Sequence, residues 1–234
     1  MAKTAVYFGT RNLYFDMIPS LKSLLMHSDV EKVYLVIEDD TFPLKLPDCV
    51  EAVNVKNQQY FTHGGPNWKS KWTWMTMMKA ALPFVFPNLD IILSLDPDTI
   101  VVDDISDLWG VDLTGKCFAA AVEPDKSKDG KIYTNVGVCL FNLKEMRNSG
   151  KADEVVRQLN IKKFEFLEQD CLNKLCAGRI AEMPSEYNSN EYVKKTRNPK
   201  IIHYAGKSNW NLEPLVLKYR YIPWSEIRGG LCIT

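Results

Sequence analysis

The sequence predicts an α/β fold in which helices flank a mostly parallel central sheet. Residues 4–37 show a strand, a helix and a second strand in succession, which is the spacing of a βαβ unit and favours parallel pairing. A short apolar run at 90–95 is typical of a buried strand, and two carboxylates, Asp96 and Asp98, follow it directly. At 234 residues the chain is long enough to bury a core of its own.

The N-terminal part supplies the βαβ unit. Strands are expected at 4–8, 32–37 and 50–55, and apolar residues at helical spacing predict a helix over 13–27. The first strand closes in the turn 9–12, at the sheet edge where open α/β folds bind their ligands. This turn is a candidate for contact with a base or a ribose, and an ordinary turn is the alternative.

Asp96 and Asp98 are candidates for a ligand site. Residues two apart in an extended segment point to the same side, so both carboxylates converge at the carboxyl end of a central strand. Hard oxygen ligands of this kind suit a divalent cation that also holds phosphate. Pro97 between them stiffens the turn. The alternative is that Asp-Pro-Asp simply ends a strand, since both residue types are common in turns.

A long helix that is apolar nearly all round is expected over 68–82, closed by Pro83 and Pro87. Two lysines interrupt its apolar surface and need a reason. Lys71 and Lys79 fall within about 80° of each other on the helical wheel, so both can face the carboxylates or an anion bound there. Snorkelling of the two side chains at the edge of the helix is the alternative.

The next predicted strands lie at 118–122 and 132–141, with a polar, glycine-containing loop at 126–131 between them. Asn135 and Gly137 interrupt the apolar run of the second strand. A glycine inside a strand often lets another group come close, and here we expect that group to be a sugar.

Two further helices are expected, at 152–159 and from 167 onward. The second has Glu168, Gln169 and Asp170 in its first turn. The helix dipole favours carboxylates at that position, which is a sufficient structural explanation. Three such polar side chains together are also able to bracket the hydroxyl groups of a sugar.

The segment 200–207 combines an apolar strand with His203, Gly206 and Lys207. It offers an imidazole for a metal and an ammonium for a phosphate in one short loop. A lone histidine on a strand is otherwise an ordinary core or surface residue. The tail at 215–224 mixes aromatic with basic residues, which suits either weak contact with a membrane surface or simple packing.

Composition narrows the class of protein. Lys and Arg together number 29, as do Asp and Glu, so the chain lacks the basic excess of a bulk nucleic-acid binder. Six cysteines in mostly apolar contexts, without a Cys-x-x-Cys pair, indicate buried reduced thiols. We expect a cytoplasmic protein, because the N-terminus lacks the apolar stretch of a signal peptide and no window is apolar for long enough to span a membrane.

Four motifs in this order resemble glycosyltransferase family 8, which includes glycogenin-like enzymes and bacterial lipopolysaccharide galactosyl- and glucosyltransferases. They are Asp96-Pro-Asp98-Thr-Ile-Val after an apolar strand, Asn135-Val-Gly137-Val, Glu168-Gln169-Asp170-x-x-Asn173, and His203-Tyr-Ala-Gly206-Lys207. The resemblance implies a GT-A fold made by a single domain over 1–234. It further implies a nucleotide-binding half at 1–100, a donor-sugar and acceptor half at 101–210, and a C-terminal tail at 211–234.

The resemblance also implies an activity. Members transfer a hexose, here glucose or galactose, from a UDP-sugar to a glycan, glycolipid or protein acceptor with retention at the anomeric carbon. They need Mn²⁺, and Mg²⁺ is the other candidate. The implied metal ligands are Asp96, Asp98 and His203, and the implied catalytic residues are Glu168, Gln169 and Asp170. The implied contacts to the nucleotide and the donor sugar are Gly9, Thr10, Arg11, Asn12, Tyr14, Lys79, Asp96, Pro97, Asp98, Asn135, Gly137, Gly206 and Lys207.

This chain departs from the family pattern at three positions. Glu168 stands where the family has aspartate, Lys79 stands where it usually has arginine, and Lys207 directly follows Gly206. A lysine in place of an arginine replaces a planar fork of donors by a point charge. These departures bear on the identity of the sugar and on the contacts to phosphate rather than on the class of enzyme.

Two alternative functions are considered. One is a catalytically inactive UDP-sugar-binding protein of the same fold. The other is a haloacid-dehalogenase-type phosphatase, whose Asp-x-Asp motif continues with Gly-Thr, whereas Thr99 directly follows Asp98 here. For the transferase, the acceptor pocket is expected to be formed by the variable loops 125–131 and 187–198.

Overall fold

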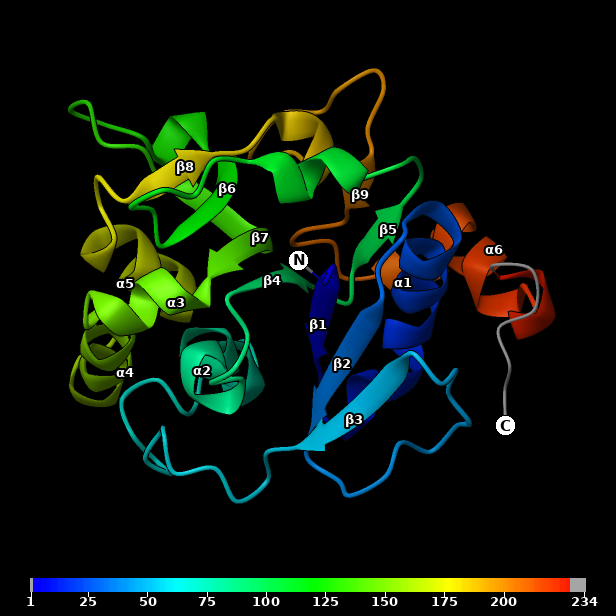
Figure 1. Ribbon diagram of the computed structural model, residues 1–234, viewed down its shortest axis with the longest axis horizontal. Helices are drawn as coiled ribbons and strands as arrows, with labels where there is room; N and C mark the ends of the chain where they lie inside the picture. The colour runs from blue at the N-terminus through cyan, green and yellow to red at the C-terminus, as the bar shows by residue number, and fades with distance from the viewer. Residues whose placement is uncertain (1, 228–234) are drawn as a thin grey trace.

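A seven-stranded sheet forms the centre of the computed structural model, which describes residues 2–227 (Figure 1). Its strands are β1 (Thr4–Phe8), β2 (Lys32–Ile37), β3 (Val50–Asn54), β4 (Ile91–Leu95), β6 (Phe118–Val122), β7 (Thr134–Asn142) and β8 (Ile180–Glu182). Their order in space is β3-β2-β1-β4-β7-β6-β8. β7 is antiparallel to both of its neighbours, and the other pairs are parallel. The mostly parallel sheet predicted from the sequence is therefore confirmed.

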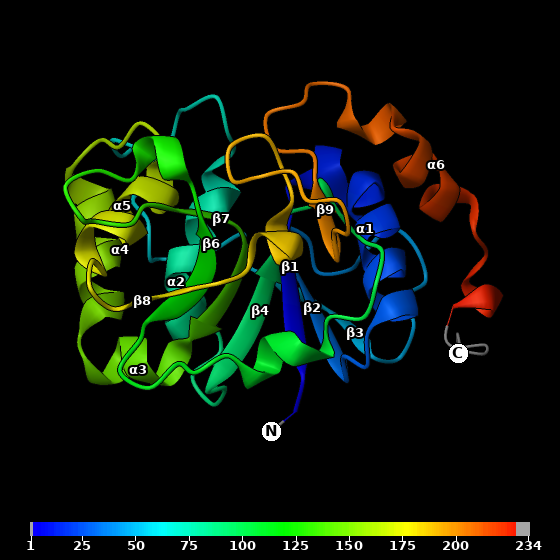
Figure 2. The same cartoon turned by 90° about the horizontal axis from the view of Figure 1, so that it is seen from above.

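Helices cover both faces of this sheet. They are α1 (Tyr14–His27), α2 (Met78–Val85), α3 (Leu143–Asn148), α4 (Lys151–Ile161), α5 (Leu167–Leu175) and α6 (Pro214–Tyr221). Side chains of β1 alternate between the two faces, as they must in a strand. Ala5 and Tyr7 pack with α1, while Val6 and Phe8 pack in the core that includes α2. Figure 2 shows α3, α4 and α5 at the β6–β8 end of the molecule and α6 beside α1 at the opposite end.

A separate two-stranded sheet stands beside the end of β4. It consists of β5 (Thr99–Val101) and β9 (Ile201–His203), paired in antiparallel register. The sequence predicted a strand at 200–203 and none as short as β5. Because β5 begins directly after Asp98, this small sheet connects the C-terminal part of the chain to the carboxylate motif.

The segment predicted as one long helix, 68–82, is largely a loop. Turns and bends continue to residue 72, a 3-10 helix covers Trp74–Met77, and α2 begins only at Met78. The rings of Trp68 and Trp74 stack with their centroids 5.0 Å apart. Residues six apart lie on different faces of an α-helix, so a continuous helix would lose this contact. Aromatic packing therefore outweighs the helical pattern.

Other differences from the predicted elements are smaller. Pro83, expected to end a helix, lies inside α2. It removes one backbone hydrogen-bond donor and crowds the carbonyl four residues before it, and α2 ends two residues later, at Val85. β7 begins two residues later than predicted. β8 was not predicted, since a three-residue strand is too short for a periodic pattern.

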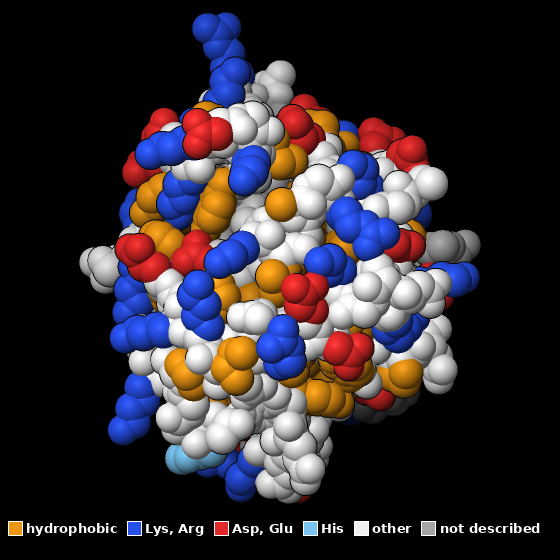
Figure 3. Space-filling view, turned by 90° about the vertical axis from the view of Figure 1, so that its left-hand side faces the viewer, with side chains coloured by type: hydrophobic (Ala, Val, Ile, Leu, Met, Phe, Trp, Pro, Cys, Tyr) orange, Lys and Arg blue, Asp and Glu red, His pale blue; other side chains and the backbone are white. Residues whose placement is uncertain are grey.

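The sequence predicted buried thiols, and the described cysteines can be compared with that prediction. Cys117, Cys139, Cys171 and Cys176 are buried and unbridged, as expected. Cys232 lies outside the described residues, as does the end of the predicted tail 211–234. Between residues 2 and 227, the structure contains no helix long and apolar enough to cross a membrane. Figure 3 shows basic and acidic side chains interspersed on the face of the molecule that it presents.

Candidate active site

The turn after β4 fixes both carboxylates of the Asp-x-Asp motif. In the turn Asp96-Pro97-Asp98-Thr99, the carbonyl of Asp96 accepts hydrogen bonds from the amide (3.2 Å) and the hydroxyl (2.7 Å) of Thr99. The amide of Asp96 donates to the carbonyl of Gly137 in β7 (2.8 Å). Proline suits the second position of such a turn because its fixed φ matches it. The backbone thus holds both acids at the carboxyl end of β4.

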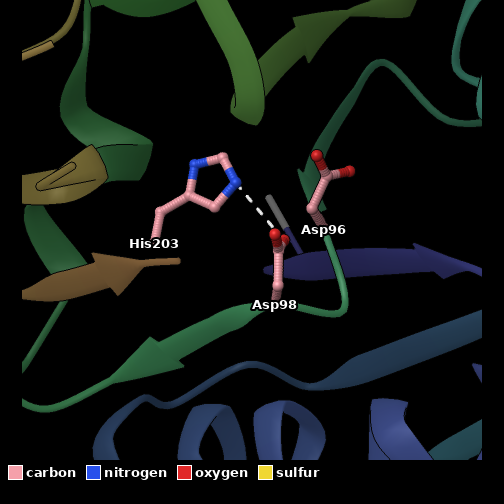
Figure 4. A group of neighbouring side chains, drawn as sticks. All are labelled: Asp96, Asp98 and His203. Atoms are coloured by element: carbon pink, nitrogen blue, oxygen red, sulfur yellow. Dashed lines mark ion pairs between the residues drawn. The ribbon is translucent and has the colours of Figure 1, made fainter. Parts of the chain in front are cut away.

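His203 reaches this turn through the small sheet of β5 and β9. Its register places Thr99 opposite His203, and the amide of Tyr204 donates to the carbonyl of Asp98 (2.9 Å). Nε2 of His203 then lies 3.3 Å from Oδ1 of Asp98 (Figure 4). The pairing of two short strands therefore joins residues that are distant in the sequence.

Gly137 makes room for this imidazole. A Cβ atom at position 137 would lie 2.1 Å from Cε1 of His203 and 2.9 Å from each ring nitrogen, closer than side chains tolerate. From the sequence we expected a sugar as the close neighbour of this glycine. In the structure the neighbour is His203, so this glycine serves the position of the histidine.

Two asparagines orient the histidine from the other side of its ring. Nδ1 of His203 lies 2.8 Å from Oδ1 of Asn188, and Nδ2 of Asn188 donates to Oδ1 of Asn135 (3.0 Å). This hydrogen-bond pattern assigns the ring proton to Nδ1 and leaves Nε2 directed at Asp98, as is typical of metal-binding histidines. Sequence reasoning missed Asn188, because a single asparagine in a loop gives no positional signal.

Asp96, Asp98 and His203 fit a divalent cation. One ligand atom from each lies within 4.8 Å of the others, and two carboxylates with one imidazole suit Mn²⁺ or Mg²⁺. Burial raises the pKa of Asp96 above its ordinary value. Burial also acts to raise the pKa of Asp98, but the neighbouring His203 outweighs it and that pKa is lowered. Two acids held this closely require positive charge between them.

Lys79 brings a buried positive charge to the same acids. Its Nζ lies 2.6 Å from Oδ1 of Asp96 and 3.5 Å from Oε1 of Glu168, and it donates to the carbonyl of Val136 (3.3 Å). Burial acts to lower the pKa of Lys79, but the two carboxylates outweigh burial and raise it. The side chain is 3% exposed, so it does not snorkel. Lys79 therefore faces the carboxylates, as one of the two interpretations predicted.

The first turn of α5 divides the predicted catalytic trio. Glu168 and Gln169 line the cavity described below, whereas Asp170 does not. Oδ1 of Asp170 accepts from the hydroxyl of Tyr133 (2.5 Å), and its Oδ2 accepts from the amide of Phe166 (2.8 Å), which closes the start of the helix. The structure thus gives Asp170 the helix-terminal position that a carboxylate favours there.

Glu123, which follows β6, is a buried acid that sequence reasoning did not assign to the site. Its Oε1 accepts from Nδ2 of Asn135 (2.8 Å) and from Nε2 of Gln169 (3.3 Å), and its Oε2 lies 3.0 Å from Nζ of Lys126. A signal was present, because Glu123 ends an apolar strand just as Asp96 does. Glu123 connects Gln169 to the loop that carries Lys126.

These residues surround a cavity of about 580 Å³, a size typical of sites for small ligands. Eleven of the predicted residues line it: Asn12, Lys79, Asp96, Pro97, Asp98, Asn135, Gly137, Glu168, Gln169, His203 and Gly206. Six predicted residues do not line it: Gly9, Thr10, Arg11, Tyr14, Asp170 and Lys207.

The N-terminal turn contributes one polar side chain, Asn12, to the cavity wall. Arg11 instead forms a two-pronged ion pair with Asp39, which also accepts from the hydroxyl of Tyr14 (3.1 Å). At Gly9 a Cβ atom would lie 2.7 Å from Sδ of Met17, so the glycine allows α1 to pack closely. Gly9, Arg11 and Tyr14 therefore stabilise the local fold and do not line the cavity.

Lys207 lies outside the cavity wall, in the loop that follows β9. Its Nζ is paired with Oε1 of Glu213 (2.5 Å), and its side chain is half exposed. Gly206 before it has a φ of +74°, which a glycine adopts without strain. A contact between Lys207 and a bound phosphate would require this ion pair to open.

Comparison with known proteins gives a family match over most of the chain. The family model "Glycosyl transferase family 8" matches residues 6–211. The chain is 28% identical to glycosyltransferase GlyE of Streptococcus pneumoniae, over 97% of this chain and 58% of GlyE. It is 27% identical to lipopolysaccharide 1,2-glucosyltransferase of Escherichia coli, over 59% of this chain and 52% of that protein. The chain thus spans little more than half the length of these curated relatives.

A solved structure gives a likeness of fold. The crystal structure of galactosyltransferase LgtC in complex with donor and acceptor sugar analogues matches 94% of this chain and 98% of LgtC, with a TM-score of 0.72. The two sequences are 19% identical. At that identity the likeness concerns the fold alone.

Proposed function

Because the chain belongs to glycosyltransferase family 8 and has the GT-A fold, we propose that it is a retaining transferase that moves glucose or galactose from a UDP-sugar to a glycan, glycolipid or protein. The main support is the convergence of Asp96, Asp98 and His203 on a cavity that Glu168 and Gln169 also line. The family match includes the whole Asp-x-Asp region, so we set the phosphatase alternative aside.

The donor diphosphate is proposed to bind beside the Asp-x-Asp turn. Asp96, Asp98 and His203 would hold Mn²⁺ or Mg²⁺, which when bound supplies positive charge that neutralises the leaving group. Lys79, through its 2.6 Å ion pair, holds Asp96 in place and puts a second positive charge beside the donor. Contact with the nucleoside is proposed for Asn12, the polar residue of the N-terminal turn that lines the cavity.

Transfer is proposed to occur on one face of the donor sugar. The acceptor hydroxyl attacks the anomeric carbon from the side that the diphosphate leaves, the bond from that carbon to the phosphate oxygen breaks, and the departing phosphate takes the acceptor's proton. Glu168 and Gln169 stabilise the positive charge that develops on the sugar ring. Glu168 is ion-paired with Lys79 and Gln169 is a neutral amide, which supports stabilising roles over nucleophilic ones. A covalent sugar adduct trapped on Glu168 would contradict this step.

Release of UDP from a panel of UDP-sugars tests the proposal. With Mn²⁺ present we expect turnover of one hexose donor, loss of turnover in chelator, and a decrease of at least about 100-fold in Asp98→Asn. Asp153→Asn, at an exposed position on α4, is the matched control.

Two other outcomes would change the conclusion. UDP binding that depends on Mn²⁺, without turnover of any sugar, would favour the inactive binding protein. Failure to bind UDP under any condition would contradict the assignment of the site.

A further inference from the structure

We propose that the outer end of the cavity is an acceptor subsite for a sugar that carries an anionic group, a carboxylate or a phosphate. The subsite is a cation–aromatic cluster of Lys71, Trp72, Lys126 and Phe166, all of which line the cavity. This inference rests on the proposed sugar transfer and names the chemical class of its acceptor.

Both lysines of the cation–aromatic cluster lie against one ring. Nζ of Lys71 is 4.1 Å from the ring centroid of Trp72 and 5.4 Å from that of Phe166. Nζ of Lys126 is 3.5 Å from the same Phe166 centroid. The distance between the two Nζ atoms is therefore at most the sum of their distances to the Phe166 centroid. Both ammonium groups thus belong to the same part of the cavity wall.

The cluster carries an excess of positive charge. Lys126 has Glu123 as its partner at 3.0 Å, and the other oxygen of Glu123 is already bonded to Asn135 and Gln169. Within residues 2–227, no carboxylate lies within 4 Å of Nζ of Lys71. One of two neighbouring ammonium groups thus has no counter-charge. Lysines paired with carboxylate or phosphate of a ligand form charge-assisted hydrogen bonds, which are stronger than neutral ones.

A series of contacts leads from the metal ligands, through the residues proposed to stabilise the donor sugar, to the cation–aromatic cluster. Lys79 bridges Asp96 and Glu168, and Gln169, the next residue, bonds to Glu123. Glu123 in turn pairs with a lysine of the cluster. The residues proposed to stabilise the donor sugar therefore separate the metal ligands from the cluster. An acceptor must approach the donor sugar from such a position.

Two aromatic faces complete the subsite. The rings of Trp72 and Phe166 have centroids 5.6 Å apart and are inclined by 46°. Flat rings bury the apolar C–H face of a pyranose, while the lysines beside them meet its charged group. The members come from three segments: the loop before α2, the turn after β6 and the residue before α5. Convergence of three segments on one pocket is typical of a built site.

The test compares three sugars that differ only at C6: methyl β-glucoside, methyl β-glucuronide and methyl β-glucoside 6-phosphate. Binding is followed by protein tryptophan fluorescence, with and without Mn²⁺ and UDP. We expect at least one anionic sugar to bind about tenfold more tightly than the neutral one. Comparison of the glucuronide with the 6-phosphate decides whether the subsite prefers a carboxylate or a phosphate. Lys71→Gln and Lys126→Gln should each reduce this preference, while binding of the neutral sugar persists.

Matched controls are available two residues away from each lysine. Lys69 and Lys128 are exposed and do not line the cavity, so Lys69→Gln and Lys128→Gln should keep the preference. Equal binding of the three sugars by the native protein, including no binding of any, would overturn the proposal. Weaker UDP binding in Lys71→Gln would also overturn it, by assigning that lysine to the donor. Failure of the native protein to bind UDP would instead count against the proposed transfer. The acceptor subsite is judged separately, because the sugars are also tested without UDP.

Discussion

At the inner end of the cavity, the carboxylates of Asp96, Asp98 and Glu168 face one buried lysine, Lys79. At the outer end, Lys126 pairs with the carboxylate of Glu123, while Lys71 lies against Phe166 without a carboxylate within 4 Å in the described part of the chain. The inner end therefore has more carboxylates than lysines and suits a divalent cation, whereas the outer end can accept negative charge. One cavity with opposite imbalances at its ends suits a reaction in which a metal-bound donor meets a separate acceptor.

The two ends also differ in how they are held. Asp96 and Asp98 follow β4 and His203 ends β9, where backbone hydrogen bonds fix their positions, while Lys79 and Glu168 lie on α2 and α5. The outer residues belong to a loop, a short turn and the residue before a helix. The proposed catalytic residues are thus held by regular elements, whereas the proposed acceptor subsite lies on segments that tolerate change.

Removing the positive charge at the inner end should have the largest effect. Lys79→Met leaves Asp96 and Glu168 as buried acids without their lysine. We expect UDP release to fall by about 100-fold and the free energy of unfolding to fall by about 3 kcal/mol, as measured by steady-state kinetics and urea denaturation. Lys79→Arg keeps the charge and should retain more of both. Native-like activity in Lys79→Met would show that the ion pair is dispensable.

Displacing the histidine should come next. In Gly137→Ala the added Cβ overlaps the ring of His203, so we expect UDP release and Mn²⁺ affinity each to fall by about 30-fold. Gly110→Ala is the matched control, because a Cβ at Gly110 meets nothing within 4 Å and its φ is not positive. Equal effects of the two substitutions would contradict the role assigned to Gly137.

The trio at the start of α5 should separate into two behaviours. Asp170→Asn should lower the melting temperature by about 3 °C through the helix start, with UDP release changed by less than about threefold. Gln169→Ala should lower UDP release by about tenfold. Thermal unfolding and kinetics on both variants check this. If Asp170→Asn impairs UDP release as much as Gln169→Ala does, Asp170 acts in catalysis after all.

A smaller effect is expected in the pH dependence of stability. Burial raises the pKa of Glu168 above that of an unfolded glutamate. The folded state therefore holds this proton more tightly than the unfolded state does. The contribution of protonated Glu168 to stability is greatest in acid and is lost as pH rises through the raised pKa. Glu168→Gln does not titrate there. Its melting temperature relative to the native protein, measured in chelator, should rise by about 2–3 °C between pH about 4 and neutral pH. Parallel curves would show that Glu168 is not destabilised by burial.

Much of the fold and of the inner end was predictable from the sequence. Apolar runs marked most strands, and Asp96, Asp98 and His203 stood at strand ends, where parallel sheets gather their ligands. The predicted helix over 68–82 was wrong because stacking of Trp68 on Trp74 replaces helical packing. That error also placed Lys71 beside Lys79 on one helix, whereas Lys71 lies in the loop before Trp74 and contacts the rings of Trp72 and Phe166.

The outer end was largely hidden in the sequence. The predicted acceptor loop 125–131 contributes Lys126, and loop 187–198 contributes Tyr192 to the cavity wall. Phe166 had no such signal, because its position beside Lys126 depends on how α5 packs against β7. Contacts of this kind arise from tertiary packing, which neither periodicity nor spacing records.

The central claim is that Asp96, Asp98 and His203 hold the divalent cation that the donor requires. Its most direct test is a titration of Mn²⁺ into metal-free protein followed by electron paramagnetic resonance, in which the sharp signal of free Mn²⁺ is lost on binding. We predict a single Mn²⁺ per chain, bound more tightly with UDP, in the native protein and in Asp153→Asn, and loss of this binding in Asp98→Asn. Unchanged Mn²⁺ binding in Asp98→Asn would contradict the claim.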